Sequence, residues 1–333
     1  MFVVQSYPLA VFFCLITMLC WGSWANTQKL AGPRWRFELY YWDYVFGVVI
    51  LTTISAFTLG SFGSAGRSFL ADAQQAHFEY ILSAIAGGII FNAANILLVA
   101  AIDIAGMAVA FPVGIGLALV LGVIVNYVGQ PQGNPVLLFL GVAFILAAII
   151  LDALAYRRLP GQSKKISTKG LVLAILCGIL MGFFYRFVAR GMVEDHVNPY
   201  GGRLTPYTAV YFFSLGMLAS NLLFNRLLMA RPFTGEPVSW ADYRRGTLRQ
   251  HALGLLGGIV WAVGMTLSIV AAGQAGFAIS YGLGQGATLV AAVWGVFVWK
   301  EFRDAPPGAK PLIWLMFPGY VIGLALIIAA RVM

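Results

Sequence analysis

Charged residues are scarce in this 333-residue sequence: Asp, Glu, Lys and Arg make up 10% of it, whereas hydrophobic residues make up 60%. Soluble domains carry about 25% charged residues, because a surface that faces water needs them. The mean hydropathy of +0.85 is likewise more apolar than that of a soluble domain. The composition therefore excludes an ordinary water-soluble domain and indicates a chain that lies largely in lipid.

Cysteine and histidine are also scarce, with three residues of each. All three cysteines fall in apolar stretches, where a free cysteine packs as a small polarizable side chain. The histidines are expected in loops, far apart in sequence, and no H-E-x-x-H or nucleophile-elbow pattern occurs. We predict no disulfide, metal site, cofactor or enzyme activity for these residues, which are Cys14, Cys20, Cys177, His77, His196 and His251.

Long apolar stretches are abundant, and each is about 20 residues long, enough to cross the roughly 30 Å hydrocarbon core of a bilayer. The first stretch lacks a basic leader and a cleavage-like site, so we interpret it as a span and not as a signal peptide. The sequence predicts an all-α polytopic membrane protein with ten transmembrane helices near 8–28, 40–60, 79–102, 105–128, 135–156, 170–190, 206–229, 252–272, 276–299 and 311–330.

Basic residues follow alternate links between the predicted spans. Most of the 21 Lys and Arg residues lie in the links after the first, fifth, seventh and ninth spans. By the positive-inside rule these links are cytoplasmic, which places both termini on the extracytoplasmic side of the cell (inner) membrane. The net charge of +9 is thus interpreted as an interfacial band and not as a nucleic-acid surface.

An internal repeat relates the two halves of the chain: residues 86–125 match residues 256–295 at a constant offset of 170. Because five spans is an odd number, the second copy enters the membrane from the opposite side, so the sequence predicts a 5+5 inverted repeat. The predicted organisation is a first repeat over 1–156, a cytoplasmic linker over 157–169 and a second repeat over 170–333. Bundles of this kind usually belong to secondary transporters.

Tight links and poor helix formers occur at matching places in both copies. The links between spans three and four and between spans eight and nine are expected around Asp103–Ile104 and Gly273–Gln274. Spans four and nine then carry glycines and a proline that interrupt a helix, or that simply allow close helix packing. We predict helix breaks with a gating role at Pro112, Gly114, Gly116, Gly282, Gly284 and Gly286.

Polar and aromatic residues within the spans indicate the substrate. Asn92 and Asn95 are three residues apart and share a helix face, whereas the second copy has Ala262 and Met265 there. Amides beside aromatic faces suit a small neutral polar solute. For Trp21 and Trp24, an interfacial belt is the alternative. The predicted substrate-binding residues are Asn92, Asn95, Trp21, Trp24, Tyr185, Arg186, Trp261, Tyr281 and Gln285.

Arg186 is included because an arginine within a span is costly and therefore suggests a function, although snorkelling toward Glu194 or Asp195 is an equal alternative. The twelve acidic residues, by contrast, all lie in loops or near span ends. A proton-driven exporter of cations would need a central carboxylate, so a multidrug exporter is disfavoured. Asp43 and Asp152 are the candidates for proton coupling, and salt bridges to loop arginines are the alternative.

Several of these segments resemble the drug/metabolite transporter superfamily, and within it the glucose/ribose porters and the plant ureide permeases. The resemblance is carried by the runs Cys20–Trp21–Gly22–Ser23–Trp24 and Tyr40–Tyr41–Trp42–Asp43–Tyr44, and by residues 86–95, Gly106 and Gly114–Ile115–Gly116. The carboxyl half, around Gly257–Gly258 and Lys300–Glu301, is similar to rhamnose–proton symporters. The resemblance implies a ten-span inverted repeat and uptake of a sugar or a ureide-like heterocycle, often with protons.

The linker departs from that pattern, because ureide permeases carry a longer central loop with a nucleotide-binding-like motif. The segment 157–169 is short and has no G-x-x-x-x-G-K-[ST] motif, so ATP use is not expected. We therefore expect a facilitative transporter, or a secondary active transporter such as a proton-coupled one, that takes up a small neutral polar solute. A sugar is the main expectation, and a ureide or nucleobase such as allantoin or uracil is the alternative.

Overall fold

The computed structural model describes residues 1–160 and 167–333, so residues 161–166 of the predicted linker 157–169 lie outside the described residues. Within the described part, the regular elements are helices. Ten stretches there are long and apolar enough to cross a membrane, which confirms the predicted all-α, ten-span fold. They are Tyr7–Ala31, Phe37–Phe57, Phe78–Ala105, Phe111–Gly129, Pro135–Arg157, Thr168–Gly191, Pro206–Ala230, Leu248–Ala275, Phe277–Val298 and Ala309–Ala329.

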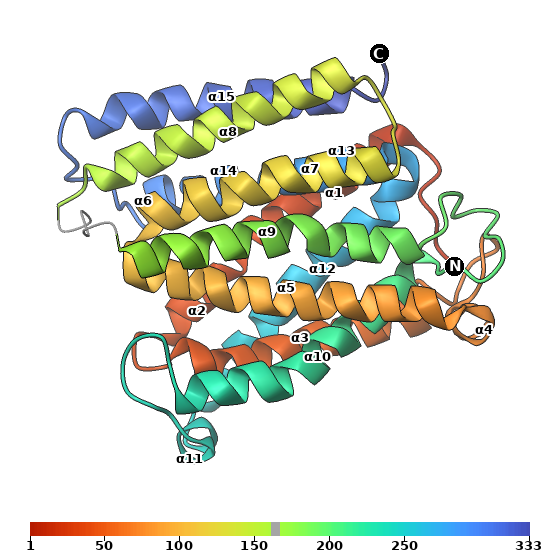
Figure 1. The fold of residues 1–333 in the computed structure, drawn as a ribbon, viewed down its shortest axis with the longest axis horizontal. Coiled ribbons are helices and arrows are strands. Elements are labelled where there is room, and N and C mark those ends of the chain that lie inside the picture. The colour runs from red at the N-terminus through yellow and green to blue at the C-terminus, as the bar shows by residue number, and fades with distance from the viewer. Residues whose placement is uncertain (161–166) are drawn as a thin grey trace. The chain divides into compact units, whose positions relative to one another are not determined.

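Three of these spans are divided into shorter helices, and the others are single helices (Figure 1). The divided spans contain α1 (Tyr7–Ser23), α2 (Ala25–Ala31), the π-helical turn η1 (Phe111–Ile115), α7 (Gly116–Gly129), α13 (Phe277–Gly284), α14 (Ala287–Val293) and the π-helical turn η2 (Trp294–Val298). The single helices are α3 (Phe37–Phe57), α5 (Phe78–Ala105), α8 (Pro135–Arg157), α9 (Thr168–Gly191), α10 (Pro206–Ala230), α12 (Leu248–Ala275) and α15 (Ala309–Ala329). Short helices in the connections are α4 (Phe69–Gln75), α6 (Met107–Ala110) and α11 (Trp240–Arg244).

The chain forms two compact units, and each unit takes segments from both halves of the sequence. Unit 1 contains Met1–Asn92 and Phe187–Gln274, and unit 2 contains Ala93–Arg186 and Ala275–Met333. That the two halves, 1–156 and 170–333, are inverted copies of one another stays a prediction.

In unit 1, α3 packs lengthwise against α10 (Figure 1). Near one end of the pair, Thr52 Oγ1 donates to Ser214 Oγ at 2.8 Å, and near the other, Asn225 Nδ2 donates to the Glu38 carbonyl at 2.9 Å. These two contacts set the helices antiparallel. On the α12 side, Gly258 lies against the Tyr44 carbonyl, where an added Cβ would collide with backbone. Small residues therefore let α3 and α12 approach closely.

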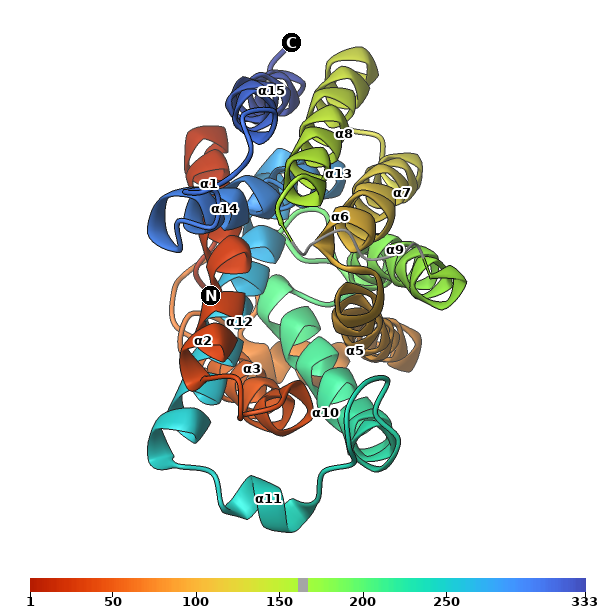
Figure 2. The ribbon, with the colours of Figure 1, turned by 90° about the vertical axis from the view of Figure 1, so that its left-hand side faces the viewer.

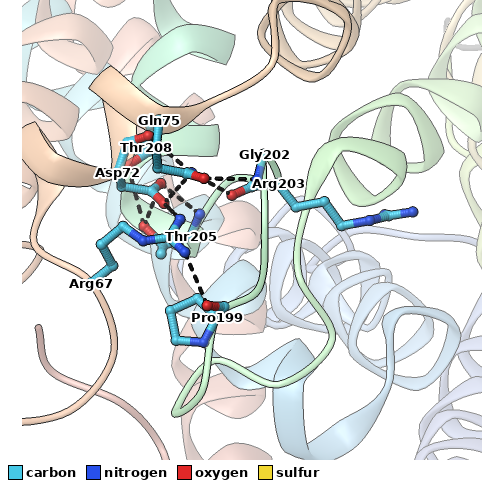
Figure 3. A network of polar contacts seen from close by, with 8 residues as sticks. All are labelled: Arg67, Asp72, Gln75, Pro199, Gly202, Arg203, Thr205 and Thr208. Atoms are coloured by element: carbon cyan, nitrogen blue, oxygen red, sulfur yellow. Dashed lines mark hydrogen bonds and ion pairs between the residues drawn. The ribbon is translucent and has the colours of Figure 1, made fainter.

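A buried carboxylate joins two connections of unit 1, and we call its contacts the Asp72 network (Figure 3). Asp72 in α4 is fully buried, and its oxygens accept hydrogen bonds from the Arg67 guanidinium at 2.9 Å, the Gln75 amide at 3.2 Å and both the backbone and hydroxyl of Thr205, at 2.7 and 3.0 Å. Thr205 is the N-cap residue of α10. A negative charge thus stabilises the positive end of the α10 dipole.

The connection between α10 and α12 carries the short helix α11, which lies away from the spanning helices of unit 1 (Figure 2). Ser239 caps α11, accepting from the Asp242 N–H, while the Asp242 carboxylate accepts from the Ser239 N–H. Trp240 and Tyr243 of α11 turn back toward the bundle, where the Trp240 ring lies 4.7 Å from that of Trp42. Arg36 donates to carbonyls in the same connection, at Thr234 and Glu236.

In unit 2, α8 and α15 lie side by side along their length (Figure 1). Gly141 of α8 and Gly323 of α15 face each other, so the two backbones approach closely. α8 begins with Pro135 after Asn134, whose side chain accepts from the Val136 N–H at 2.9 Å. This is a standard N-cap followed by proline at the first helical position.

The tight links within each copy of the repeat lie three residues later than predicted. Asp103 is still inside α5, and Gly273 is still inside α12. The breaks fall at Gly106 and Gly276, with φ values of 79° and 86°. A positive φ is strained for residues with a Cβ, so the glycines decide where each helix ends. The two break positions are again separated by the 170-residue offset of the repeat.

Helix interruptions occur in both predicted regions of unit 2, in different forms. Around Pro112, residues Phe111–Ile115 form the π-helical turn η1, because proline has no N–H for the regular ladder. In the second copy, α13 ends at Gly284 and α14 begins at Ala287, with Gln285 and Gly286 between them. At the 170-residue offset, Gly114 and Gly116 correspond to Gly284 and Gly286 at this second break, whereas Gly282 lies inside α13. A gating role for these positions stays a prediction.

Candidate functional site

The predicted site residues fall into two groups. Trp21, Trp24, Asn92 and Trp261 belong to unit 1, and Asn95, Tyr185, Arg186, Tyr281 and Gln285 belong to unit 2. In unit 1, rings from α1, α3, α5 and α10 surround Trp261 of α12, which is 4% exposed, and Trp24 between α1 and α2 packs on Tyr44. We call these residues the Trp261 cluster: Trp21, Trp24, Tyr44, Phe91, Phe213 and Trp261.

Two indoles at the centre of this cluster are parallel. The rings of Trp21 and Trp261 lie 6.0 Å apart with an interplanar angle of 10°, and Trp21 Nε1 donates to the Trp261 carbonyl at 3.3 Å. Gly264, one turn after Trp261, leaves the space that the Trp21 ring occupies. Phe91 lies 4.3 Å from Trp261. Aromatic faces arranged in this way favour a planar or apolar surface as a stacking partner.

Tyr44 brings a polar atom to the cluster. Its ring lies 4.9 Å from Trp24 and 6.4 Å from Trp261. The hydroxyl is buried and has no hydrogen-bond partner among the described residues. Buried polar groups are nearly always hydrogen-bonded, so an uncommitted hydroxyl beside aromatic faces is a feature of a binding site.

Asn92 is fully buried on α5, and its amide donor is already used within unit 1. Asn92 Nδ2 donates to Ser220 Oγ at 2.9 Å and more weakly to the Met217 carbonyl at 3.4 Å, while Oδ1 has no partner. Asn95 is also buried, with 2% exposure, but belongs to unit 2. The interhelical bond of Asn92 indicates a packing role in addition to any contact with substrate.

In unit 2 the Tyr281 hydroxyl is committed to the protein backbone. It donates to the Ala118 carbonyl at 3.0 Å and lies 3.2 Å from the Met181 carbonyl, while its ring packs on Gly122. Tyr185, whose ring lies 5.3 Å from that of Tyr281, donates to Ser280 Oγ at 3.4 Å. These contacts hold α7, α9 and α13 together, so the structure gives both tyrosines a packing role.

Gln285 follows the last residue of α13, and Arg186, inside α9, reaches the end of α7. Gln285 is 8% exposed, and its carbonyl accepts from the Thr288 hydroxyl at 3.0 Å, at the break between α13 and α14. The Arg186 guanidinium lies beside Gly129, the last residue of α7, in the space that a Cβ there would need. A cation at a helix C-terminus interacts favourably with the helix dipole. The position of the Arg186 guanidinium is therefore explained by the end of α7 and does not require a pocket.

Asp43 forms a polar triad that the sequence did not indicate. Its Oδ1 accepts from the Tyr243 hydroxyl at 2.6 Å, and its Oδ2 lies 2.9 Å from His251 Nδ1. Trp35 covers the triad, with its ring 5.2 Å from His251. Burial, followed by the bond to Asp43, raises the pKa of Tyr243. The alternative of a salt bridge from Asp43 to a loop arginine is wrong, because Tyr243 and His251 are its partners. The predicted loop position of His251 is also wrong, because His251 lies in the first turn of α12.

Asp152, the second candidate for proton coupling, is 7% exposed in α8 of unit 2, and its Oδ1 has no partner. One turn later, the Tyr156 hydroxyl donates to Glu301 Oε2 at 2.7 Å. Among the described residues no arginine bridges to Asp152. Beyond Tyr156 a cavity of about 360 Å³ is lined by Met107, Tyr156, Leu159, Pro160, Lys300, Glu301 and Asp304.

A match to a family model shows which family this chain belongs to. The ureide permease model matches residues 40–166 and 156–330, most of the sequence. The chain belongs to the ureide permease family. It is therefore a multi-pass membrane transporter of small solutes, and the family indicates a transporter and not an enzyme.

Relatives of this permease extend over its whole length. Ureide permeases 1, 4 and 2 of Arabidopsis thaliana are 22%, 21% and 22% identical to it, and each alignment covers 99% of both chains. The alignment with one solved crystal structure covers 98% of the permease and 99% of the other chain, with a TM-score of 0.60 and 14% identity. This similarity shows a shared fold alone.

These comparisons separate the two expectations about substrate. They give no support to the sugar porters as relatives or to sugar as the substrate, and the ureide alternative fits them better. The alignment with ureide permease 1 extends over 386 positions, more than the 333 residues of this permease. The relative thus carries additional residues, in line with the short linker noted in the sequence.

Proposed function

We propose that this permease carries a ureide, or a nucleobase of similar chemistry, across the cell membrane. The observation that carries the proposal is the family match over residues 40–330, which includes Tyr44, Phe91, Phe213 and Trp261 of the Trp261 cluster. Ureides are small, neutral and often planar, and they present N–H and C=O groups. The parallel indoles of Trp21 and Trp261 suit a planar ring, and the Tyr44 hydroxyl and Asn92 Oδ1 are buried polar atoms without partners.

Binding is tested first with the purified permease. A ligand that binds only the folded state stabilises it, by about 2.7 kcal/mol at a concentration 100 times its Kd. Allantoin or uracil should raise Tm, and glucose and ribose should not. Trp261→Leu should remove the shift, whereas Trp314→Leu, at a ring 63% exposed on α15, should keep it. A shift with sugars alone would overturn the proposal.

Transport is tested in proteoliposomes. Unlabelled allantoin trapped inside should drive saturable counterflow of labelled allantoin, as expected for a carrier and not for a channel. Unsaturable flux would argue against alternating access.

We further propose that protons drive uptake through Asp43 or Asp152, which are both buried within spans. Asp43 is the stronger candidate, because His251 beside it can take up the proton that the carboxylate releases. Asp43→Asn should abolish uptake driven by a pH gradient and leave counterflow intact, because counterflow needs no net proton movement. If Asp152→Asn has this effect and Asp43→Asn does not, the assignment passes to Asp152.

Orientation and repeat symmetry belong to the same proposal. We expect both termini on the extracytoplasmic side, with residues 1–156 and 170–333 as inverted copies. Cysteine accessibility at exposed ends tests this: a cysteine introduced at Met333, which is 82% exposed, should react with an impermeant reagent applied from outside the cell. Reaction only after permeabilisation would reverse the orientation.

A further inference from the structure

One face of α10 carries a buried amide with no partner. Asn221 has no exposed surface, and neither its Nδ2 nor its Oδ1 has a hydrogen-bond partner among the described residues. Buried side-chain amides are rarely left without any bond, because losing water without a replacement is unfavourable. Asn92 and Asn225, by contrast, each use their Nδ2 as a donor. Asn221 is thus the buried amide of unit 1 with both its donor and its acceptor uncommitted.

The side of α10 on which Asn221 lies faces the interior of unit 1. Phe213, Met217, Asn221 and Asn225 are spaced by four residues, so they form one stripe along the helix, and all four are buried. The opposite side is exposed, with Leu222, Leu223 and Leu227 at 57–58%. The Asn221 carboxamide therefore points into the unit and not toward lipid.

Known contacts place this stripe beside the Trp261 cluster. Phe213, two turns before Asn221, has its ring 5.9 Å from Trp261, and Met217, one turn before, is reached by the Asn92 amide. The antiparallel register of α3 and α10, fixed at Thr52–Ser214 and Glu38–Asn225, brings Asn221 close to the height of Tyr44. The Tyr44 hydroxyl is itself without a partner.

We propose that Asn221 is the residue that recognises the substrate's amide edge, and that its ligand is a ring containing a cis –NH–C(=O)– unit. This inference rests on the proposed function and adds a residue and a chemical group to it. A carboxamide presents one N–H and one C=O side by side, so it can form two parallel hydrogen bonds with a cis-amide, as asparagine does with the donor and acceptor of adenine. A sugar hydroxyl group has no such fixed planar pair.

The test compares hydantoin with 1,3-dimethylhydantoin, which has the same ring and carbonyls but no N–H. Affinities are measured by calorimetry and thermal shift on the purified full-length permease. The unmodified chain should bind hydantoin about 10- to 100-fold more tightly, as expected for a bidentate pair. Asn221→Leu should remove this preference without lowering Tm, because an apolar side chain of similar shape leaves no buried amide unpaired. Asn221→Met replaces it if the leucine variant does not fold.

A matched control is available in unit 2. Asn126 of α7 is also fully buried, and its Oδ1 has no partner, but its Nδ2 donates to the Gly122 carbonyl at 2.8 Å within its own helix. Asn126→Leu should keep the full preference for hydantoin. Loss of the preference in this variant as well would show that removing any buried amide has the effect, which would overturn the assignment to Asn221.

The outcomes also separate this inference from the proposed function. If the unmodified chain prefers hydantoin and Asn221→Leu keeps the preference, the Asn221 assignment is wrong while ureide binding stands. If the unmodified chain binds both hydantoins equally, the cis-amide recognition is wrong. If it binds neither hydantoin, allantoin nor uracil, both the inference and the proposed function fail.

Discussion

Replacing Asp72 should destabilise the permease strongly, because this carboxylate is the centre of the Asp72 network. Asp72→Ala leaves the buried Thr205 N–H without its acceptor, leaves the Arg67 guanidinium with only the Pro199 carbonyl, and removes the negative charge at the start of α10. Removing one partner of a buried ion pair costs about 3–5 kcal/mol. For a chain of this size, that corresponds to a fall in Tm of about 10 °C. Asp72→Asn, which keeps the shape but loses the charge, should have a smaller effect.

Thermal unfolding in detergent, followed by intrinsic fluorescence, measures this difference. Asp242 provides the matched control, because it also binds a serine and a backbone N–H at a helix start but does so on the exposed helix α11. Asp242→Ala should leave Tm nearly unchanged. If Asp72→Ala unfolds within about 2 °C of the unmodified chain, the network does not contribute in the way its burial and hydrogen bonds imply.

Three further predictions follow from single side chains. Burial lowers the pKa of His196 to about 4, so the unfolded chain binds this proton at a higher pH than the folded chain does. The free energy of unfolding should therefore fall on the order of 3 kcal/mol as pH drops from about 6.5 to 4. The Tm of His196→Gln should fall less over the same pH range. Lys300 has a φ of 54°, so Lys300→Gly should relieve about 1 kcal/mol of strain and raise Tm, and a fall in Tm would refute this. Tyr243→Phe removes the hydrogen bond to Asp43 and should lower stability by about 1–3 kcal/mol in chemical or thermal unfolding.

Hydropathy was sufficient to predict the ten spans, because the length and apolar character of a membrane helix are local properties of the sequence. The tight links were misplaced by three residues, since Asp103 and Gly273 look like turn residues, whereas the left-handed backbone at Gly106 and Gly276 is what ends each helix. Interruptions around Pro112 and Gly286 were predictable because backbone chemistry there is also local, whereas the predicted break at Gly282 lies inside α13.

The side-chain partners were not predictable in the same way. Asp43 and His251 are 208 residues apart, and the polar run around Arg249–Gln250 makes the first turn of α12 look like a loop. Asn221 was missed because α10 lies outside the matched segments 86–125 and 256–295, so no contrast between copies drew attention to it. Only the packing of α10 against α3 and α5 reveals that its amide is buried and unpaired.

Gly106 and Gly276 show what constrains divergence between the matched segments. The side chains of the two segments differ, since asparagines in one segment correspond to alanine and methionine in the other. Both segments nevertheless have a glycine with nearly the same φ angle. At a helical position such as Asn92 the side chain can change while the backbone keeps its helical path, but almost no replacement is tolerated where φ is positive. Point mutations can therefore change the side chains within these helices, whereas the glycines that end α5 and α12 admit almost no replacement.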